Sequence, residues 1–144
     1  MTLHLVLDTS VVAEPAMRDP DGEIVKRIRK RATQCGIPAP VWAELLMALE
    51  SLPAGDERRA VFDRYLHDVV RPSFPILPYD DAAASWYARD AARRKHAGQA
   101  RSVAAGQIAA IAVTQGLTLV TLRPKEYAGY RGLRVESWVT SGRA

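Results

Sequence analysis

The sequence predicts an α/β protein in which a mostly parallel sheet lies between two layers of helices, a three-layer α/β/α sandwich. Short apolar runs at 3–7 and 117–121 lack the alternation of polar and apolar residues that a half-exposed strand has. Segments of helical spacing separate the predicted strands, and this alternation is typical of a parallel sheet covered on both faces. A length of 144 residues fits one domain, so we expect residues 1–144 to form a single unit.

The first strand and the two helices after it follow from local patterns. Residues 3–7 are an aliphatic run that ends at Asp8, which predicts a buried strand. A short helix is expected around 11–17. A dense turn signal then precedes an amphipathic helix over 23–33, whose apolar residues fall on one face.

The middle of the chain repeats this alternation. The proline-containing segments at 37–40 and 74–78 are expected to be extended. Between them, helical spacing predicts two helices over 41–52 and 56–70, and the Pro-Ala-Gly sequence at 53–55 ends the first.

The last third predicts two helices and two strands. An aspartate pair most simply begins a long helix over 80–97, and a serine caps an alanine-rich helix over 102–115. A fully apolar strand is expected over 117–121 and a final strand over 133–135 or somewhat beyond.

Composition excludes several protein classes. A chain that is 48% hydrophobic and 25% charged is neither disordered nor collagen-like. Its single cysteine, Cys35, cannot form an internal disulfide and is expected to be a small buried thiol in a reducing compartment. No apolar run approaches the roughly 20 residues that span a bilayer, and the N-terminus does not resemble a signal peptide. We therefore expect a cytoplasmic protein.

The basic residues gather in one part of the chain. Residues 1–88 carry 10 basic and 13 acidic side chains, whereas residues 89–134 carry nine basic and two acidic ones. Sixteen of the 20 basic residues are arginine, which forms forked contacts with phosphate. Such a basic segment is typical of nucleic-acid binding. The alternative is that these charges only solvate a helix and its loop, and charge alone does not decide between the two.

Two acidic residues are candidates for chemistry. Asp8 follows the first strand, at the edge where open parallel sheets bind ligands. Its alternative role is to cap the next helix, but Thr9 and Ser10 already offer caps there. Glu44 lies in a mostly apolar helix start, and a buried glutamate is costly unless it is paired or metal-bound; the alternative is that it faces solvent. Oxygen ligands without histidine or cysteine favour Mg²⁺ or Mn²⁺.

Several segments, taken in order, resemble a PIN domain. They are Leu-Val-Leu-Asp-Thr-Ser-Val-Val at 5–12, Val-Trp-Ala-Glu-Leu at 41–45, Gln-Ile-Ala-Ala-Ile-Ala at 107–112 and Gly-Leu-Thr-Leu-Val-Thr at 116–121. The segments at 51–55 and 133–138 also resemble the VapC/FitB-type toxins of bacterial type II toxin–antitoxin pairs. The similarity spans nearly the whole chain and lies in the order and spacing of these segments.

This resemblance implies a PIN-like fold and a Mg²⁺-dependent endoribonuclease that cleaves RNA, with Mn²⁺ as a substitute metal. Asp8 and Glu44 match the first two of the family's acidic positions and are therefore the expected catalytic and metal-binding residues, with Thr9 or Ser10 as polar support. The implied partners are a cognate antitoxin, an RNA substrate and a second copy of the chain, in a homodimer or a larger toxin–antitoxin complex, with no membrane involved.

The chain departs from the family pattern at two positions. The third acidic position is Ala105, and the fourth is Arg123, which would repel a metal ion and attract phosphate. Glu126, three residues further, offers partial compensation. Because losing one positioned catalytic contact commonly costs on the order of 10²–10³ in rate, we expect an impaired nuclease. The alternative is a non-catalytic PIN-like module that binds antitoxin or RNA.

Four arginines of the basic segment are the expected contacts to RNA phosphates: Arg93, Arg94, Arg101 and Arg123.

Overall fold

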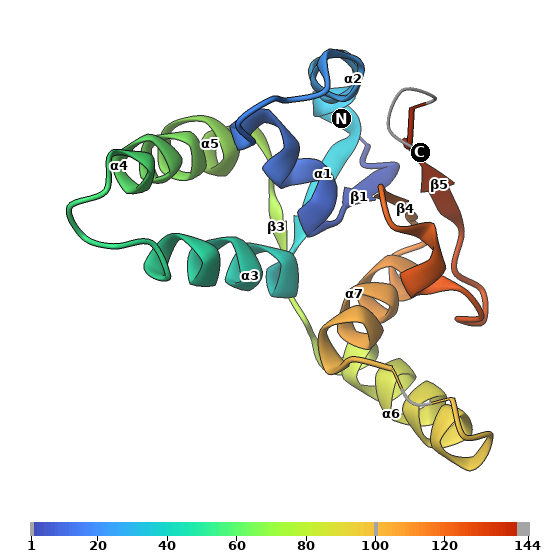
Figure 1. Ribbon diagram of the computed structural model, residues 1–144. Helices are drawn as coiled ribbons and strands as arrows, with labels where there is room; N and C mark the ends of the chain where they lie inside the picture. Colours follow the sequence, from blue (N-terminus) through green and yellow to red (C-terminus); the bar gives the residue numbers. More distant parts are fainter. Residues whose placement is uncertain (1, 100, 141–144) are drawn as a thin grey trace.

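The strands of the computed structural model, which describes residues 2–99 and 101–140, form one parallel sheet (Figure 1). The strands are β1 (Leu5–Leu7), β2 (Cys35–Pro38), β3 (Ile76–Leu77), β4 (Thr118–Thr121) and β5 (Val135–Ser137). Their order across the sheet is β3-β2-β1-β4-β5, and every neighbouring pair is parallel. The predicted parallel sheet is therefore confirmed.

Helices cover both faces of this sheet. They are α1 (Thr9–Ala13), α2 (Gly22–Arg31), α3 (Ala39–Glu50), α4 (Glu57–Arg64), α5 (Arg71–Ser73), α6 (Asp81–His96) and α7 (Val103–Thr114), with short 3₁₀ turns η1 (Glu14–Ala16), η2 (Ala32–Gln34) and η4 (Pro124–Tyr127). Figure 1 shows α2 on one side of the sheet and α3 and α7 on the other, which confirms the α/β/α sandwich. The helix predicted over 56–70 is present. Its first half is α4, and its second half winds as a π-helix, η3 (Tyr65–Val70), which continues into α5.

The central strands are buried on both faces, which explains their continuous apolar character. Every residue of β1 is at most 3% exposed. In the register of β1 with β4, Leu7 lies beside Val120. The next residue of each strand, Asp8 and Thr121, therefore lies at the same edge of the sheet, and the Asp8 N–H donates to the Val120 carbonyl at 3.1 Å. This register places the polar residues that follow the two strands next to one another.

The end of α6 and the start of α7 are set by predicted signals. Gly98 has φ of 68°, a backbone conformation that only glycine adopts readily, and it follows the last turn of α6. The Ser102 hydroxyl accepts from the Ala105 N–H at 3.1 Å and caps α7. The two helices pack closely at Gly106, where an added Cβ would lie 2.6 Å from the Tyr87 ring.

Cys35 is fully buried in β2, as expected, and burial raises the pKa of its thiol to about 11. Within residues 2–99 and 101–140, no helix has both the length and the apolar character that crossing a membrane requires.

Candidate functional site

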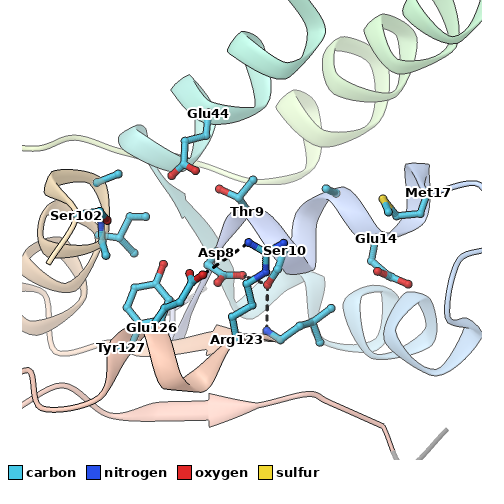
Figure 2. Close-up of a pocket in the computed structure, with 15 residues that line it drawn as sticks. Asp8, Thr9, Ser10, Glu14, Met17, Glu44, Ser102, Arg123, Glu126 and Tyr127 are labelled. Atoms are coloured by element: carbon cyan, nitrogen blue, oxygen red, sulfur yellow. Dashed lines mark hydrogen bonds and ion pairs between the residues drawn. The ribbon is translucent and has the colours of Figure 1, made fainter. Parts of the chain in front are cut away.

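A cavity of about 330 Å³ opens at the carboxyl ends of β1 and β4, the two neighbouring strands at the centre of the sheet (Figure 2). Its polar lining comes from four segments that are far apart in the sequence: Asp8, Thr9, Ser10 and Glu14 after β1, Glu44 on α3, Ser102 before α7, and Arg123, Glu126 and Tyr127 after β4. Asp8 and Glu44, the two residues that the sequence singles out, thus share one cavity.

Asp8 is 3% exposed, and both of its carboxylate oxygens accept hydrogen bonds. Oδ1 accepts from the Ser10 hydroxyl at 2.6 Å and from the Val11 N–H at 3.2 Å, while Oδ2 accepts from the Thr121 hydroxyl. The prediction that Thr9 or Ser10 caps the first helix is wrong, because Asp8 itself is the N-cap. The extended backbone at Asp8 directs its side chain toward the first turn of α1. In this orientation the carboxylate also lines the cavity.

The two hydroxyls that serve Asp8 are themselves fixed by the chain after β4. The Leu122 N–H donates to Ser10 Oγ at 3.0 Å, and the Arg123 N–H donates to Thr121 Oγ1 at 2.9 Å. Since each hydroxyl accepts a backbone N–H, its own proton is free to point at Asp8. The result is a rigid carboxylate whose position depends on the turn that begins at Leu122.

The electrostatics of the cavity favour a cation. Burial raises the pKa of Asp8 above its ordinary value, against the opposing effect of its hydrogen bonds. Burial also raises the pKa of Glu44, and the nearby negative charge of Asp8 raises it further. Tyr127 is 5% exposed, and its pKa is raised by burial and by the charges of Asp8 and Glu44, so its hydroxyl stays protonated. Two carboxylates that resist ionisation together are stabilised by a shared positive charge.

The donor set fits a magnesium ion held by few protein ligands. In the part of the chain that the structure describes, no three acidic, histidine or cysteine side chains are grouped so as to hold a metal. Mg²⁺, however, is commonly bound through one or two carboxylates, with water and substrate oxygens completing its octahedron. Thr9 lines the same cavity, and its hydroxyl lies near enough to Glu44 to lower the pKa of that carboxyl, so it adds a neutral oxygen to the donor set.

The two departures from the family pattern both lie at this cavity. Ala105, in the first turn of α7, is 8% exposed and lines the cavity with a methyl group. Arg123 also lines the cavity and is paired with Glu126 at 3.7 Å. Both side chains of that pair are more than half exposed, so the ion pair is weak and either group can turn to a ligand. Figure 2 shows Arg123 and Glu126 both reaching into the cavity from the turn after β4.

The four arginines predicted to contact RNA are not all in the same situation. Arg123 alone among them lines this cavity. Arg94 is 3% exposed, and its Nε donates to Asp90 at 2.9 Å. Arg93 donates to a backbone carbonyl just after η4, and Arg101 donates to one carbonyl within η4 and one just after it. Whether these residues bind RNA stays a prediction.

Sequence reasoning did not single out Thr121 or Tyr127 as site residues. Thr121 is fully buried and fixes Asp8 from the neighbouring strand. A signal for it exists: a polar residue that ends an otherwise apolar strand needs a partner, and Asp8 ends the first strand in the same way. Tyr127 gives no such signal, because its place in the cavity depends on the path of η4.

Known proteins are similar to this chain over most of its length. Residues 5–123 match the model of the PIN domain family. Plasmid stability protein StbB of Pseudomonas syringae pv. tomato is 30% identical over 130 residues, which cover 87% of this chain and 93% of that protein. Toxin FitB of Neisseria gonorrhoeae is 30% identical over 120 residues, which cover 81% of this chain and 86% of that protein.

Solved structures lead to the same family. The crystal structure of FitAcB from Neisseria gonorrhoeae superposes with a TM-score of 0.81 at 28% identity, covering 91% of this chain and 95% of that one. The family model covers most of the chain, and the two relatives extend the match over at least four-fifths of it. This chain therefore belongs to the PIN domain family.

Proposed function

We propose that this chain is the toxin of a toxin–antitoxin pair and that it hydrolyses RNA phosphodiester bonds with the help of Mg²⁺, more slowly than a PIN domain with a complete acidic site. The observation that carries the proposal is the meeting of Asp8 and Glu44 in one cavity, where burial raises the pKa of both and the charge of Asp8 raises that of Glu44 further. A toxin role is supported by the similarity to Toxin FitB and to the plasmid stability protein.

Each side chain at the cavity has a distinct role in this proposal. Asp8 and Glu44 would hold the metal, and the hydroxyls of Ser10 and Thr121 keep the Asp8 oxygens in place. A Mg²⁺ ion bound there would lower the pKa of a coordinated water and offset charge on the attacked phosphate. Arg123, whose side chain is 68% exposed, is able to contact a phosphate oxygen at the cavity mouth.

Ala105 limits the rate because its methyl group cannot accept a proton or bind a cation. Glu126 does not replace it fully, since its carboxylate is more than half exposed and is paired with Arg123. We expect RNA cleavage that is slower, by about 10²–10³, than that of a variant with a carboxylate at position 105.

The proposed partners follow from the same similarity. We expect a cognate antitoxin to bind this chain, and the chain to form a homodimer or a larger toxin–antitoxin complex. Val11 and Val12 of α1 are 0% and 2% exposed, so they belong to the core and offer no surface to a partner. Val61 on α4 is 56% exposed and is free to take part in such an interface. A cytoplasmic location suits an RNA substrate and a lone cysteine.

The experiment that tests the activity is cleavage of structured RNAs by the purified protein with Mg²⁺, with Mn²⁺, and with EDTA. The matched control is Asp8→Asn, which keeps the shape of the side chain and removes the charge that a metal needs. Cleavage that requires a divalent metal and disappears in Asp8→Asn supports the proposal. Cleavage that survives this substitution, or that persists in EDTA, contradicts it.

A second candidate function is a non-catalytic module that binds RNA or antitoxin. Ala105 and Arg123 favour it, because one removes a carboxylate from the cavity and the other adds a cation. This candidate predicts salt-sensitive RNA binding without turnover. Turnover that is lost in EDTA and restored by Mn²⁺ eliminates it.

A further inference from the structure

The turn that carries Arg123 and Glu126 is held from outside by three arginines of another part of the chain. Arg101 forks across the turn: its Nη1 donates to the Lys125 carbonyl at 3.2 Å and its Nη2 to the Ala128 carbonyl at 3.2 Å. These two carbonyls bracket Glu126 and Tyr127, the residues that η4 contributes to the cavity. A lysine ammonium cannot make such a planar two-point contact.

Arg94 contacts one of the same carbonyls, and Arg93 contacts the carbonyl one residue further along. Arg94 Nη2 donates to the Ala128 carbonyl at 3.4 Å, and Arg93 Nη2 donates to the Gly129 carbonyl at 3.3 Å. Gly129 has φ of 82°, so the backbone there turns in a way that other residues resist. Charged donors thus contact carbonyls at the end of a short 3₁₀ turn, in addition to the turn's own bond from the Ala128 N–H to the Lys125 carbonyl at 3.4 Å.

Asp90 fixes both guanidinium groups on α6. Its side chain is 6% exposed and accepts from Arg93 Nη2 at 2.7 Å and from Arg94 Nε at 2.9 Å. The Arg94 guanidinium also lies 3.8 Å from the centroid of the Tyr130 ring. Buried charges are kept in a fold only when they are paired, and here the pairing orients Arg93 and Arg94 toward the loop.

We propose that Arg93, Arg94 and Arg101, which we call the arginine clasp, are positioning residues, with Asp90 as their anchor. They hold η4 so that Glu126 and Arg123 face the cavity that contains Asp8. This inference rests on the proposed function, because the cavity is its proposed metal and RNA site. It gives three of the four expected RNA contacts a different role, since their guanidinium groups are engaged by this chain's own backbone.

The two roles of Arg101 predict different responses to substitution. A positioning role requires the fork, so Arg101→Lys and Arg101→Gln both weaken metal binding at the cavity. A phosphate-contact role requires only the charge, so Arg101→Lys should bind RNA as the wild type does. In Arg101→Gln, a plot of log RNA affinity against log salt concentration should become less steep by about one. Arg89→Gln is the matched control, because Arg89 is an exposed arginine of α6 that makes no hydrogen bond or ion pair to the loop within the described residues.

The test combines two measurements on the full chain. Mn²⁺ affinity is measured by electron paramagnetic resonance, and amide hydrogen exchange is followed over residues 123–129. We expect both Arg101 variants to bind Mn²⁺ about tenfold more weakly, a typical effect of losing an outer support of a metal site, and to exchange faster over these residues. Arg89→Gln should change neither quantity.

Wild-type Mn²⁺ affinity in Arg101→Lys overturns the positioning role, whether or not the loop exchanges faster. Faster exchange with unchanged affinity means that the arginine clasp is only structural. The wild-type titration is run first and tests the proposed function by itself: absence of Mn²⁺ binding refutes the metal site, whereas normal wild-type binding with unaffected variants refutes only the arginine clasp.

Discussion

Replacing Ala105 by aspartate adds a third carboxylate to the cavity, where the helix dipole and the charges of Asp8 and Glu44 act on it in opposite directions. Position 105 is the third residue of α7, where a carboxylate gains about 0.3–1 kcal/mol from the helix dipole. Repulsion from Asp8 and Glu44 opposes this gain, and each unit by which their pKa rises further costs about 1.4 kcal/mol. Without metal at neutral pH, we therefore expect Ala105→Asp to be less stable than the wild type.

Binding of a divalent metal should turn this loss of stability into a gain. If the third carboxylate tightens Mg²⁺ binding tenfold, saturating Mg²⁺ adds about 1.4 kcal/mol to the free energy of unfolding relative to the wild type. For a domain of this size, that corresponds to a further rise in Tm of about 4 °C. The same substitution should speed RNA cleavage by about 10²–10³, since it restores one positioned contact.

The assay is thermal unfolding with and without Mg²⁺ at neutral pH, together with initial rates of RNA cleavage. Val103→Asp is the control: it lies in the same turn of α7 and is 59% exposed, but it does not line the cavity. The control should show the helix-dipole gain without any dependence on Mg²⁺. If Ala105→Asp gains no more from Mg²⁺ than Val103→Asp does, the cavity is not a metal site and the reasoning fails.

Three further predictions follow from the same contacts. Arg123→Asn should tighten Mn²⁺ binding severalfold and weaken RNA binding, because it removes the one cation that lines the cavity among the described residues; equal or weaker Mn²⁺ affinity in a titration would argue against this. Because the pKa values of Asp8 and Glu44 are raised, their contribution to the free energy of unfolding is largest below about pH 4 and is lost as pH rises through the raised values. Mg²⁺ requires the ionised carboxylates, so its stabilising effect should grow over the same pH range. We therefore expect curves of Tm against pH, measured with and without Mg²⁺, to separate toward neutral pH; parallel curves would contradict this. Asp90→Asn should cost about 3–5 kcal/mol in chemical denaturation, because it leaves the buried Arg94 guanidinium without a counter-charge; a cost below about 1 kcal/mol would show that the pair is not isolated from solvent.

Much of the fold could be predicted because its elements depend on local signals. The apolar run at 3–7 and the strand over 117–121 carry their burial in their composition, and the Asp80 and Ser102 caps begin the helices that were expected there. The π-helical turn within 56–70 could not be predicted, since helical spacing does not distinguish windings that differ by one residue in their hydrogen bonds.

The candidate site could be predicted in part for a related physical reason. Asp8 and Glu44 follow from strand position, helix phase and the family pattern, and they do line one cavity. The sequence offered the cap role of Asp8 only as an alternative, because the three polar residues at 8–10 all offer caps and only the backbone conformation selects one of them. The contacts of Arg93, Arg94 and Arg101 link residues 24 to 36 positions apart, and no local pattern encodes which charges a distant loop engages.

The most direct test of the central claim, that Asp8 and Glu44 form a metal centre, is anomalous diffraction from crystals of this protein soaked in Mn²⁺. We predict one strong peak in the cavity, within coordinating distance of both carboxylates, and its loss in Asp8→Asn crystals soaked in the same way. A cavity without a peak at Mn²⁺ concentrations that saturate the protein in solution, or a peak that persists in Asp8→Asn, would contradict it.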